Sequence, residues 1–263
     1  MPLTTGRATT TDRTRAIAVV ALAVVQLVVA GLGGSGAVGE SIGVVARSYP
    51  SPVLPADWTF AIWGPIYLAF LGYAGYQVLP AQRGRAVHRA TGWWLAASAV
   101  LNAAWILAFS AHYVLLAELL IVALLVVLAR VFGRLSRERA TSTVERAALR
   151  FPVALYTGWV SLAVVAATAA TGVRLGLPGE GALATIAAML MLLVAAGIVA
   201  SVTTFGTAVV GYAAAAVWAL VGIALNDPPP AVGVAAAVAV VVVLFATARR
   251  VGTSGDPRRA AWG

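Results

Sequence analysis

Residues 182–201 read ALATIAAMLMLLVAAGIVAS, twenty residues in a row without a charge. A helix that crosses a membrane needs about 20 apolar residues, because ~30 Å of hydrocarbon divided by ~1.5 Å of rise per residue gives that length. A transmembrane β-strand would have about ten residues of alternating polarity, whereas this run is longer and does not alternate. It therefore predicts a membrane-spanning α-helix.

Seven further stretches of the chain have the same character. Of the 263 residues, 61% are hydrophobic and 10% are charged, which leaves too little polar surface for a water-soluble protein of this size. We predict an all-α polytopic membrane helix bundle with eight spans and no soluble domain. The other seven runs lie at 16–33, 59–79, 92–110, 113–132, 151–172, 205–225 and 231–248.

The eighteen basic residues, all of them arginine, are distributed unevenly over the loops. With the N-terminus taken as inside, sixteen lie in inner segments, and only Arg47 and Arg174 lie in outer ones. Cytoplasmic loops carry such an excess of arginine. The distribution predicts a multi-pass protein of the cell (plasma) membrane with cytoplasmic tails at 1–15 and 249–263.

The net charge of +9 raises the question of a nucleic-acid partner. The arginines lie beside span ends and do not form one patch with interleaved aromatic residues. We therefore expect these arginines to interact with the lipid bilayer, and we expect no nucleic-acid partner.

Several kinds of chemistry are excluded or disfavoured. The chain has no cysteine, which excludes disulfides and thiolate ligands. It has no phosphate-binding loop and no hydrolase motif. His88 and His112 are predicted in loops on opposite sides of the membrane, so they cannot ligate one ion. We predict no metal site and expect binding rather than catalysis.

The first apolar run has two interpretations. Arg13 and Arg15 before it, and the small residues of 33–37 after it, resemble a cleaved secretory signal. The run is somewhat long for a signal, and its removal would make the number of spans odd. We favour a retained span.

The longest outer segment, 34–58, is rich in Gly, Ser and Pro and reads YPSPVLP at 49–55, so it cannot be a regular helix. Asp57 is a suitable N-cap for the helix that follows. Pro65, one and a half turns later, is expected to kink that helix. A kinked helix beneath a stiff loop could form the mouth of a ligand site.

Aromatic residues recur at helical spacing in three of the spans, so each set shares one helix face. Tryptophans near span ends suit the interfacial aromatic belt: Trp58, Trp93, Trp94 and Trp262. Trp63 and Trp105 lie deeper, where an indole N–H needs an acceptor, and are predicted to face the bundle interior. The three sets are Phe60, Trp63, Tyr67 and Phe70; Asn102, Trp105 and Phe109; and Tyr156 with Trp159.

Two polar residues lie inside predicted spans. Glu118 is about five residues inside the fourth span, and intramembrane carboxylates are functional candidates because they are costly there. The alternative is a neutral glutamate that only joins two helices. Asn102 suits an interhelical hydrogen bond better than a ligand contact.

Several of these residues together resemble the translocator protein / tryptophan-rich sensory protein family, over about 15–172. Glu118 falls where that family's fourth helix has an acidic residue. The chain departs from the family pattern at Tyr49-Pro50, where the family has Lys-Pro, and it lacks one tryptophan of the loop motif. The residues that carry the resemblance are Tyr49-Pro50-Ser51, Pro55 and Trp58; Trp63-Gly64-Pro65-Ile66-Tyr67; Leu101-Asn102-x-x-Trp105; and Tyr156-x-x-Trp159.

The resemblance implies a five-helix membrane core over 16–172. In that family an inner cavity, lidded by the first outer loop, binds porphyrins and other flat hydrophobic ligands, often in a homodimer. No cofactor is required, and a tetrapyrrole would be the bound ligand. The implied ligand-binding residues are Trp63, Tyr67, Asn102, Trp105, Glu118, Tyr156 and Trp159.

Residues 173–248 add three spans with no counterpart in the family as usually described. They could shield the bundle, form an oligomer contact or extend the cavity. For function, we expect a sensory or regulatory protein that binds a flat hydrophobic ligand. The alternatives are a transporter of a small hydrophobic solute, in which the Pro65 kink and Glu118 would be the working parts, a porphyrin-degrading enzyme, and a structural membrane subunit.

Overall fold

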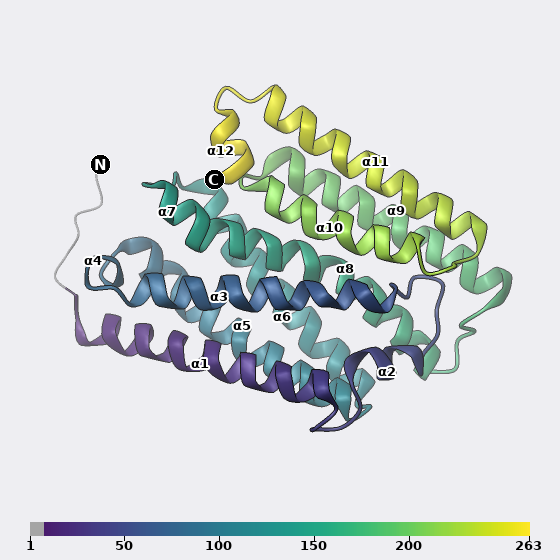
Figure 1. Cartoon of the computed structure of the whole chain (residues 1–263). Helices are drawn as coiled ribbons and strands as arrows, with labels where there is room; N and C mark the ends of the chain where they lie inside the picture. Colours follow the sequence, from purple (N-terminus) through teal and green to yellow (C-terminus); the bar gives the residue numbers. More distant parts are fainter. Residues whose placement is uncertain (1–7) are drawn as a thin grey trace.

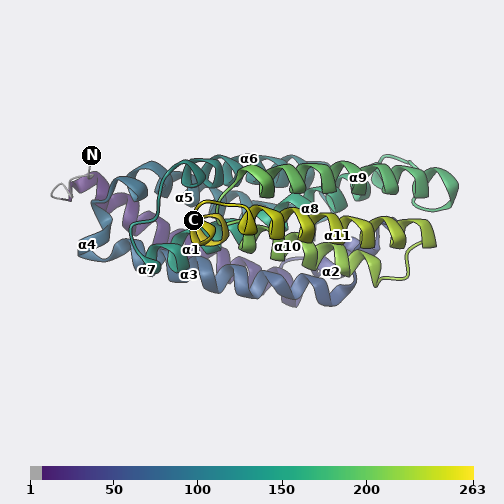
Figure 2. The ribbon, with the colours of Figure 1, turned by 90° about the horizontal axis from the view of Figure 1, so that it is seen from above.

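The computed structural model describes residues 8–263, and in that part of the chain every regular element is a helix. In these residues eight of the helices are long, and they run side by side along one direction (Figures 1 and 2). Each falls on one of the eight predicted runs, so the predicted all-α bundle is confirmed. They are α1 (Thr10–Ser35), α3 (Trp63–Val78), α5 (Ala86–Ser110), α6 (Val114–Arg137), α8 (Phe151–Arg174), α9 (Gly181–Phe205), α10 (Val209–Ala224) and α11 (Pro230–Gly252).

Six of these helices are long and apolar enough to cross a membrane: α1, α5, α6, α8, α9 and α11. The chain is therefore a multi-pass membrane protein. α3 and α10 have 16 residues each, about 24 Å of helix at ~1.5 Å per residue. A 3₁₀ helix, η1 (Asp57–Ile62), leads directly into α3 and lengthens its path to about 36 Å.

Short helices cap the two ends of the bundle (Figure 1). α2 (Ile42–Arg47) lies at one end, in the loop between α1 and α3. The start of α1 lies at the opposite end, which we call the arginine-rich end. The short helices at that end are α4 (Pro80–Arg83), α7 (Thr143–Glu145), the π-helical η2 (Arg146–Arg150) and α12 (Pro257–Trp262).

The long helices form two rings that share α8. In the first ring the neighbours are α1, α5, α6, α8 and α3, which are the five helices of the predicted 16–172 core. In the second ring α8 packs on α10, α10 on α11, and α11 on α9. The close approach of α8 to α10 depends on Gly158, where a Cβ atom would collide with the backbone of Tyr212.

α6 illustrates why these helices suit lipid. One face buries Ala117, Ile121, Leu124 and Leu128, and the opposite face exposes equally apolar residues such as Leu119. A helix that is hydrophobic all round suits a membrane, where exposed apolar residues meet acyl chains. The packing of side chains, and not the removal of apolar surface from water, must then hold the ring together.

The start of α3 differs from the prediction in two ways. Ala56, and not Asp57, is the N-cap of η1, and the Asp57 carboxylate instead pairs with Arg47. α3 begins at Trp63, so Pro65 lies in its first turn, where a backbone N–H has no intrahelical acceptor in any case. The expected kink inside the helix is therefore replaced by the junction between η1 and α3.

Buried ion pairs close the arginine-rich end. The Asp12 carboxylate lies 2.8 Å from Arg15 and 2.7 Å from Arg89, and joins α1 to α5. The Glu145 carboxylate lies 2.6 Å from Arg85 and 3.0 Å from Arg150. Both carboxylates are buried, as are Arg15 and Arg150, and loss of one partner from a pair that is buried on both sides typically costs about 3–5 kcal/mol.

Candidate functional site

The indole of Trp63 is the centre of a cluster of aromatic rings in the first ring of helices. Its centroid lies 5.4 Å from Tyr67, on which it stacks, and 5.6 Å from Trp105 of α5. From α8 come Trp159, at 5.8 Å, and Tyr156, at 6.0 Å, both edge-on. All five side chains are buried. The spacings of three and four residues within α3 and α8 place these rings on facing sides of the two helices.

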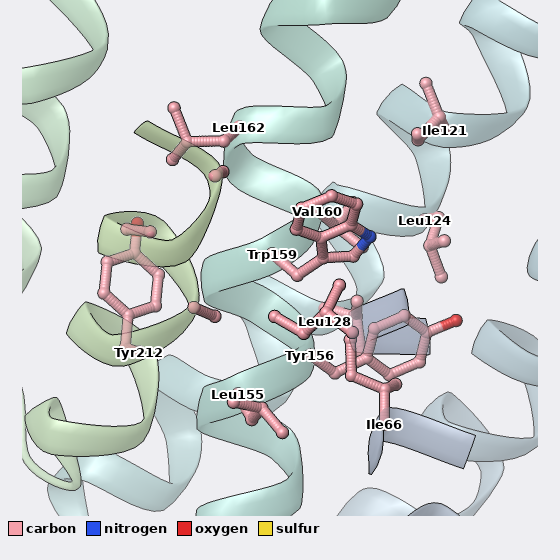
Figure 3. Close-up of a cluster of buried hydrophobic side chains, with 14 of the residues drawn as sticks. Ile66, Ile121, Leu124, Leu128, Leu155, Tyr156, Trp159, Val160, Leu162 and Tyr212 are labelled. Atoms are coloured by element: carbon pink, nitrogen blue, oxygen red, sulfur yellow. The ribbon is translucent and has the colours of Figure 1, made fainter. Parts of the chain in front are cut away.

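Figure 3 shows how α8 separates the two rings of helices. Tyr156 and Trp159 point to the side of Ile66 on α3 and Leu124 on α6, and Tyr212 of α10 lies on the other side of α8. The aromatic cluster therefore lies on the five-helix side of α8, and Tyr212 packs on the α10 side within the same hydrophobic core.

A polar group lies beside the aromatic cluster. The Asn102 side-chain oxygen accepts hydrogen bonds from the Tyr67 hydroxyl at 3.1 Å and from the Gln26 amide at 3.2 Å. The same Gln26 amide is 3.4 Å from the Tyr156 hydroxyl. Asn102 thus joins three helices, as expected for interhelical hydrogen bonding. Gln26 was not among the predicted site residues, although it is the one side-chain amide in the 16–33 run.

Three indole N–H groups of the cluster have no hydrogen-bond partner among the described residues. They belong to Trp63, Trp105 and Trp159, and all three nitrogens are buried. A buried donor without an acceptor costs about 1–3 kcal/mol, and such groups are rare in native proteins. The cluster therefore presents three unused donors.

A cavity of about 50 Å³ lies against these indoles, on the side away from the arginine-rich end. Its lid comes from the loop before η1, through Tyr49, Ser51, Leu54 and Pro55. Sites for small molecules usually measure about 300–1,000 Å³. The cavity is much smaller than that and contains almost no free space. Its walls are alanines of α8 and two residues of α10: Ala163, Ala166, Ala167, Ala170, Ala219 and Ile223.

α10 holds the lid in place with hydrogen bonds. The Ala56 N–H donates to the Gly222 carbonyl at 3.0 Å, and the Trp218 indole donates to the Thr59 carbonyl at 2.8 Å. The Asn226 amide, just after α10, donates to Leu54 at 3.0 Å. Any side chain at Gly222 would collide with Thr59. Of the roles left open for the last three helices, α10 therefore extends the cavity wall and also fastens its lid.

A protein-family model described as TSPO-like protein matches residues 15–249. The chain belongs to the TSPO-like family. The match continues beyond 172, where the motif resemblance ends, and includes α10 with its cavity and lid contacts. No curated protein and no solved structure matches the chain.

A second hollow of this TSPO-like protein, of about 340 Å³, adjoins the aromatic cluster between α1, α2 and α3. Three residues, Ile42, Phe60 and Trp63, line both this hollow and the cavity beside the indoles, and so lie between the two. The Arg47–Asp57 ion pair lies on its rim. We call this hollow the vestibule.

The structure does not bring Glu118 to the aromatic cluster. Its carboxylate accepts a hydrogen bond from the Thr168 hydroxyl of α8 at 2.8 Å. Neither residue lines the closed cavity, which α8 faces with Trp159, Ala163 and Ala170 instead. Six of the seven predicted ligand-binding residues therefore lie in or beside one cluster, and Glu118 of α6 lies against another face of α8.

One of the two histidines lies differently from the prediction. His88 is not in a loop but in α5, fully buried beside the rings of Tyr73 and Tyr76. His112 is in the turn between α5 and α6, where its ring nitrogens lie 3.1 Å from the Tyr49 hydroxyl and 3.1 Å from Glu40. Within the described residues, no group of three or more side chains of metal-binding type comes together.

Six of the tryptophans have the exposure that their positions in the sequence indicate. The four near span ends are between 40% and 48% exposed: Trp58, Trp93, Trp94 and Trp262. Trp63 and Trp105 are 7% and 5% exposed. The prediction that these two face the bundle interior is confirmed.

Proposed function

We propose that this TSPO-like protein binds a flat hydrophobic molecule that carries hydrogen-bond acceptors, of the porphyrin class, between the aromatic residues of its five-helix ring, in a sensory or regulatory role. The observation that carries the proposal is that three tryptophans line one cavity and that each has a buried indole N–H with no partner among the described residues. The residues assigned to the site are Trp63, Tyr67, Asn102, Trp105, Tyr156 and Trp159.

The chemistry of the cluster suits such a ligand. A flat aromatic molecule can stack on the broad faces of Trp63 and Trp105, and aromatic pairs contribute about 0.5–1.5 kcal/mol beyond their buried area. Acceptor atoms at its edge would satisfy the indole donors, at about 0.5–1.5 kcal/mol for each hydrogen bond. A purely structural subunit gains nothing from unpaired donors, because phenylalanine would fill the space without the cost.

The size of the cavity implies that binding requires opening. A volume of about 50 Å³ is far below the 300–1,000 Å³ of ordinary ligand sites. The vestibule supplies about 340 Å³ on the other side of the Phe60 and Trp63 rings, so rotation of these rings would join the two spaces. Entry therefore takes place near the 34–57 loop, and the lid hydrogen bonds to α10 limit its rate.

The orientation of the protein is part of the proposal. The arginine-rich end carries nearly all of the basic residues, which favours the cytoplasmic face of a cell membrane. The lid and the vestibule then face the outside, and the ligand arrives from there or from the outer leaflet.

The test is a titration of the detergent-purified protein with protoporphyrin, followed by tryptophan fluorescence. Saturable quenching at micromolar ligand is expected for the wild type. The variant Trp63→Phe/Trp105→Phe should bind at least tenfold more weakly, a loss of about 1.4 kcal/mol.

The matched control is Trp93→Phe/Trp94→Phe, which removes the same number of indoles from exposed positions. It should bind like the wild type. Quenching that rises linearly and equally in all three proteins would mean that protoporphyrin only partitions into the micelle. Uptake into proteoliposomes and the absorption spectra of products would then examine transport and porphyrin degradation.

A further inference from the structure

Three arginines form a basic stripe on the outer side of α6, towards the arginine-rich end. Arg130, Arg134 and Arg137 are spaced by four and three residues, so they lie on one face of the helix. All three are exposed. None of them takes part in an ion pair with another described residue. The stripe therefore presents three positive charges that the described part of the chain does not neutralise.

The same face of α6 continues as apolar surface towards the other end of the bundle. Leu119, Val122 and Val126 precede Arg130 at spacings of three and four residues and are between 39% and 69% exposed. The distance from Leu119 to Arg130 is about 16 Å along the helix. This is about half of the ~30 Å hydrocarbon thickness of a bilayer, so one leaflet's acyl chains meet the apolar part and the basic stripe begins where they end.

Trp94 of the neighbouring helix α5 lies beside the start of the basic stripe. The central guanidinium carbon of Arg130 lies 5.1 Å from the centroid of the Trp94 ring, a cation–π contact. Trp94 is 40% exposed, as is typical of tryptophans at the level of the lipid headgroups. The contact therefore holds Arg130 at the depth where lipid phosphates lie.

The charges around Arg130 and Arg134 favour an anion and leave a cation without a partner. α5 contains no acidic residue. The one acid of α6 is Glu118, and it lies about 18 Å from Arg130 along the helix. A guanidinium group presents five N–H donors in a planar fork that matches the oxygens of a phosphate.

Two general effects explain only part of this arrangement. Arginines in the last turn of a helix interact favourably with its free carbonyls, which accounts for Arg134 and Arg137. Arg130 lies about two turns before the end of α6, beyond the reach of that effect. The excess of arginine in cytoplasmic loops does not account for a guanidinium packed on a tryptophan of the adjacent helix.

We propose that this surface binds the headgroup of an anionic phospholipid from the adjacent leaflet. The phosphate accepts hydrogen bonds from Arg130 and Arg134, which are about 6 Å apart along the helix, and an acyl chain lies along the stretch from Val126 to Leu119. Trp94 positions Arg130. The surface shares no residue with the aromatic cluster, and the proposal depends neither on the function proposed for that cluster nor on which side of the membrane this end faces.

The test is native mass spectrometry of the intact detergent-solubilised protein with phosphatidylglycerol, and with phosphatidylcholine of the same acyl chains as the zwitterionic probe. One saturable site for phosphatidylglycerol is expected, with phosphatidylcholine at least tenfold weaker, because its choline cation finds no acid nearby. Arg130→Gln/Arg134→Gln should weaken phosphatidylglycerol binding at least tenfold, a loss of about 1.4 kcal/mol.

The matched control is Arg13→Gln/Arg249→Gln, which removes two charges from exposed arginines of α1 and α11 at the same end. It should bind phosphatidylglycerol within twofold of the wild type. An equal loss in the two double variants would mean that only net charge attracts the lipid, and would overturn the proposal, as would equally tight binding of phosphatidylcholine. Protoporphyrin quenching in Arg130→Gln/Arg134→Gln should be unchanged, so the two sites succeed or fail separately.

Discussion

The Asn102 side chain shows how a single amide can position an aromatic site. It accepts hydrogen bonds from Tyr67 and Gln26, which come from two other helices. The Tyr67 ring, held in this way, stacks on Trp63. In a membrane, such polar contacts supply part of the specificity that the hydrophobic effect supplies in water.

Replacement of Asn102 by leucine should therefore destabilise the protein by about 1–3 kcal/mol, because it leaves the Tyr67 hydroxyl buried and unpaired. Adding Tyr67→Phe should recover part of the loss, since the Tyr67 hydroxyl, one of the two donors to Asn102, is then absent. Thermal unfolding in detergent measures both. The losses of stability caused by Asn102→Leu and by Trp93→Phe should instead add up in the double variant to within about 0.5 kcal/mol. Additivity of Asn102→Leu with Tyr67→Phe would contradict the role given to this hydrogen bond.

The residue scale also shows what a sequence can reveal about the site. The depth of Trp63 and Trp105 in their spans was enough to predict that they face inwards, because an indole N–H is poorly tolerated in lipid. Gln26 could have been found by the same reasoning. Glu118 could not be placed correctly, because its neighbours depend on which face of α8 meets α6, and spacing along one helix does not determine that.

At the scale of elements, α10 is the long helix outside the five-helix ring that lines the cavity. It contributes wall residues and hydrogen bonds to the lid. The sequence revealed α10 as an apolar run but gave no sign of these contacts, since they join Trp218 to Thr59 and Asn226 to Leu54 across more than 150 residues. Long-range pairing of this kind leaves no periodic signal in the chain.

Loss of one lid contact should make ligand entry faster. Trp218→Phe keeps an aromatic ring but removes the hydrogen bond to Thr59. A hydrogen bond worth about 0.5–1.5 kcal/mol corresponds to an increase of roughly 2- to 12-fold in the association rate of protoporphyrin. Stopped-flow fluorescence measures this rate, and Trp262→Phe, at an exposed position of the opposite end, serves as control. An unchanged rate in Trp218→Phe would show that the lid does not limit entry.

At the scale of the whole molecule, an even number of long helices returns the chain to the end where it started. The start of α1 and α12 lie at the arginine-rich end, and α2 lies at the other (Figure 1). Hydrophobic runs and arginine counts were enough to predict this architecture, because run length and loop charge follow from the bilayer itself. The sharing of α8 between two rings was not predictable, since runs of Ala, Val and Leu give no information on which helices become neighbours.

The absence of cysteine from the chain allows a direct test of orientation. Ser48→Cys, at the exposed end of α2, should react with a membrane-impermeant maleimide in intact cells. Thr253→Cys, just after α11, should react only after the membrane is permeabilised. Both positions are exposed, so accessibility to solvent is matched. Labelling in the reverse pattern would place the lid on the cytoplasmic side.

The central claim is that unpaired indole N–H groups receive the ligand, and ¹⁵N NMR of the eight tryptophan indoles tests it most directly. Single Trp→Phe variants assign each signal. On addition of protoporphyrin, the signals of Trp63, Trp105 and Trp159 are predicted to move by the largest amounts, while those of the exposed Trp93, Trp94 and Trp262 stay in place. Shifts confined to the exposed indoles, with the three buried signals unchanged, would contradict the account.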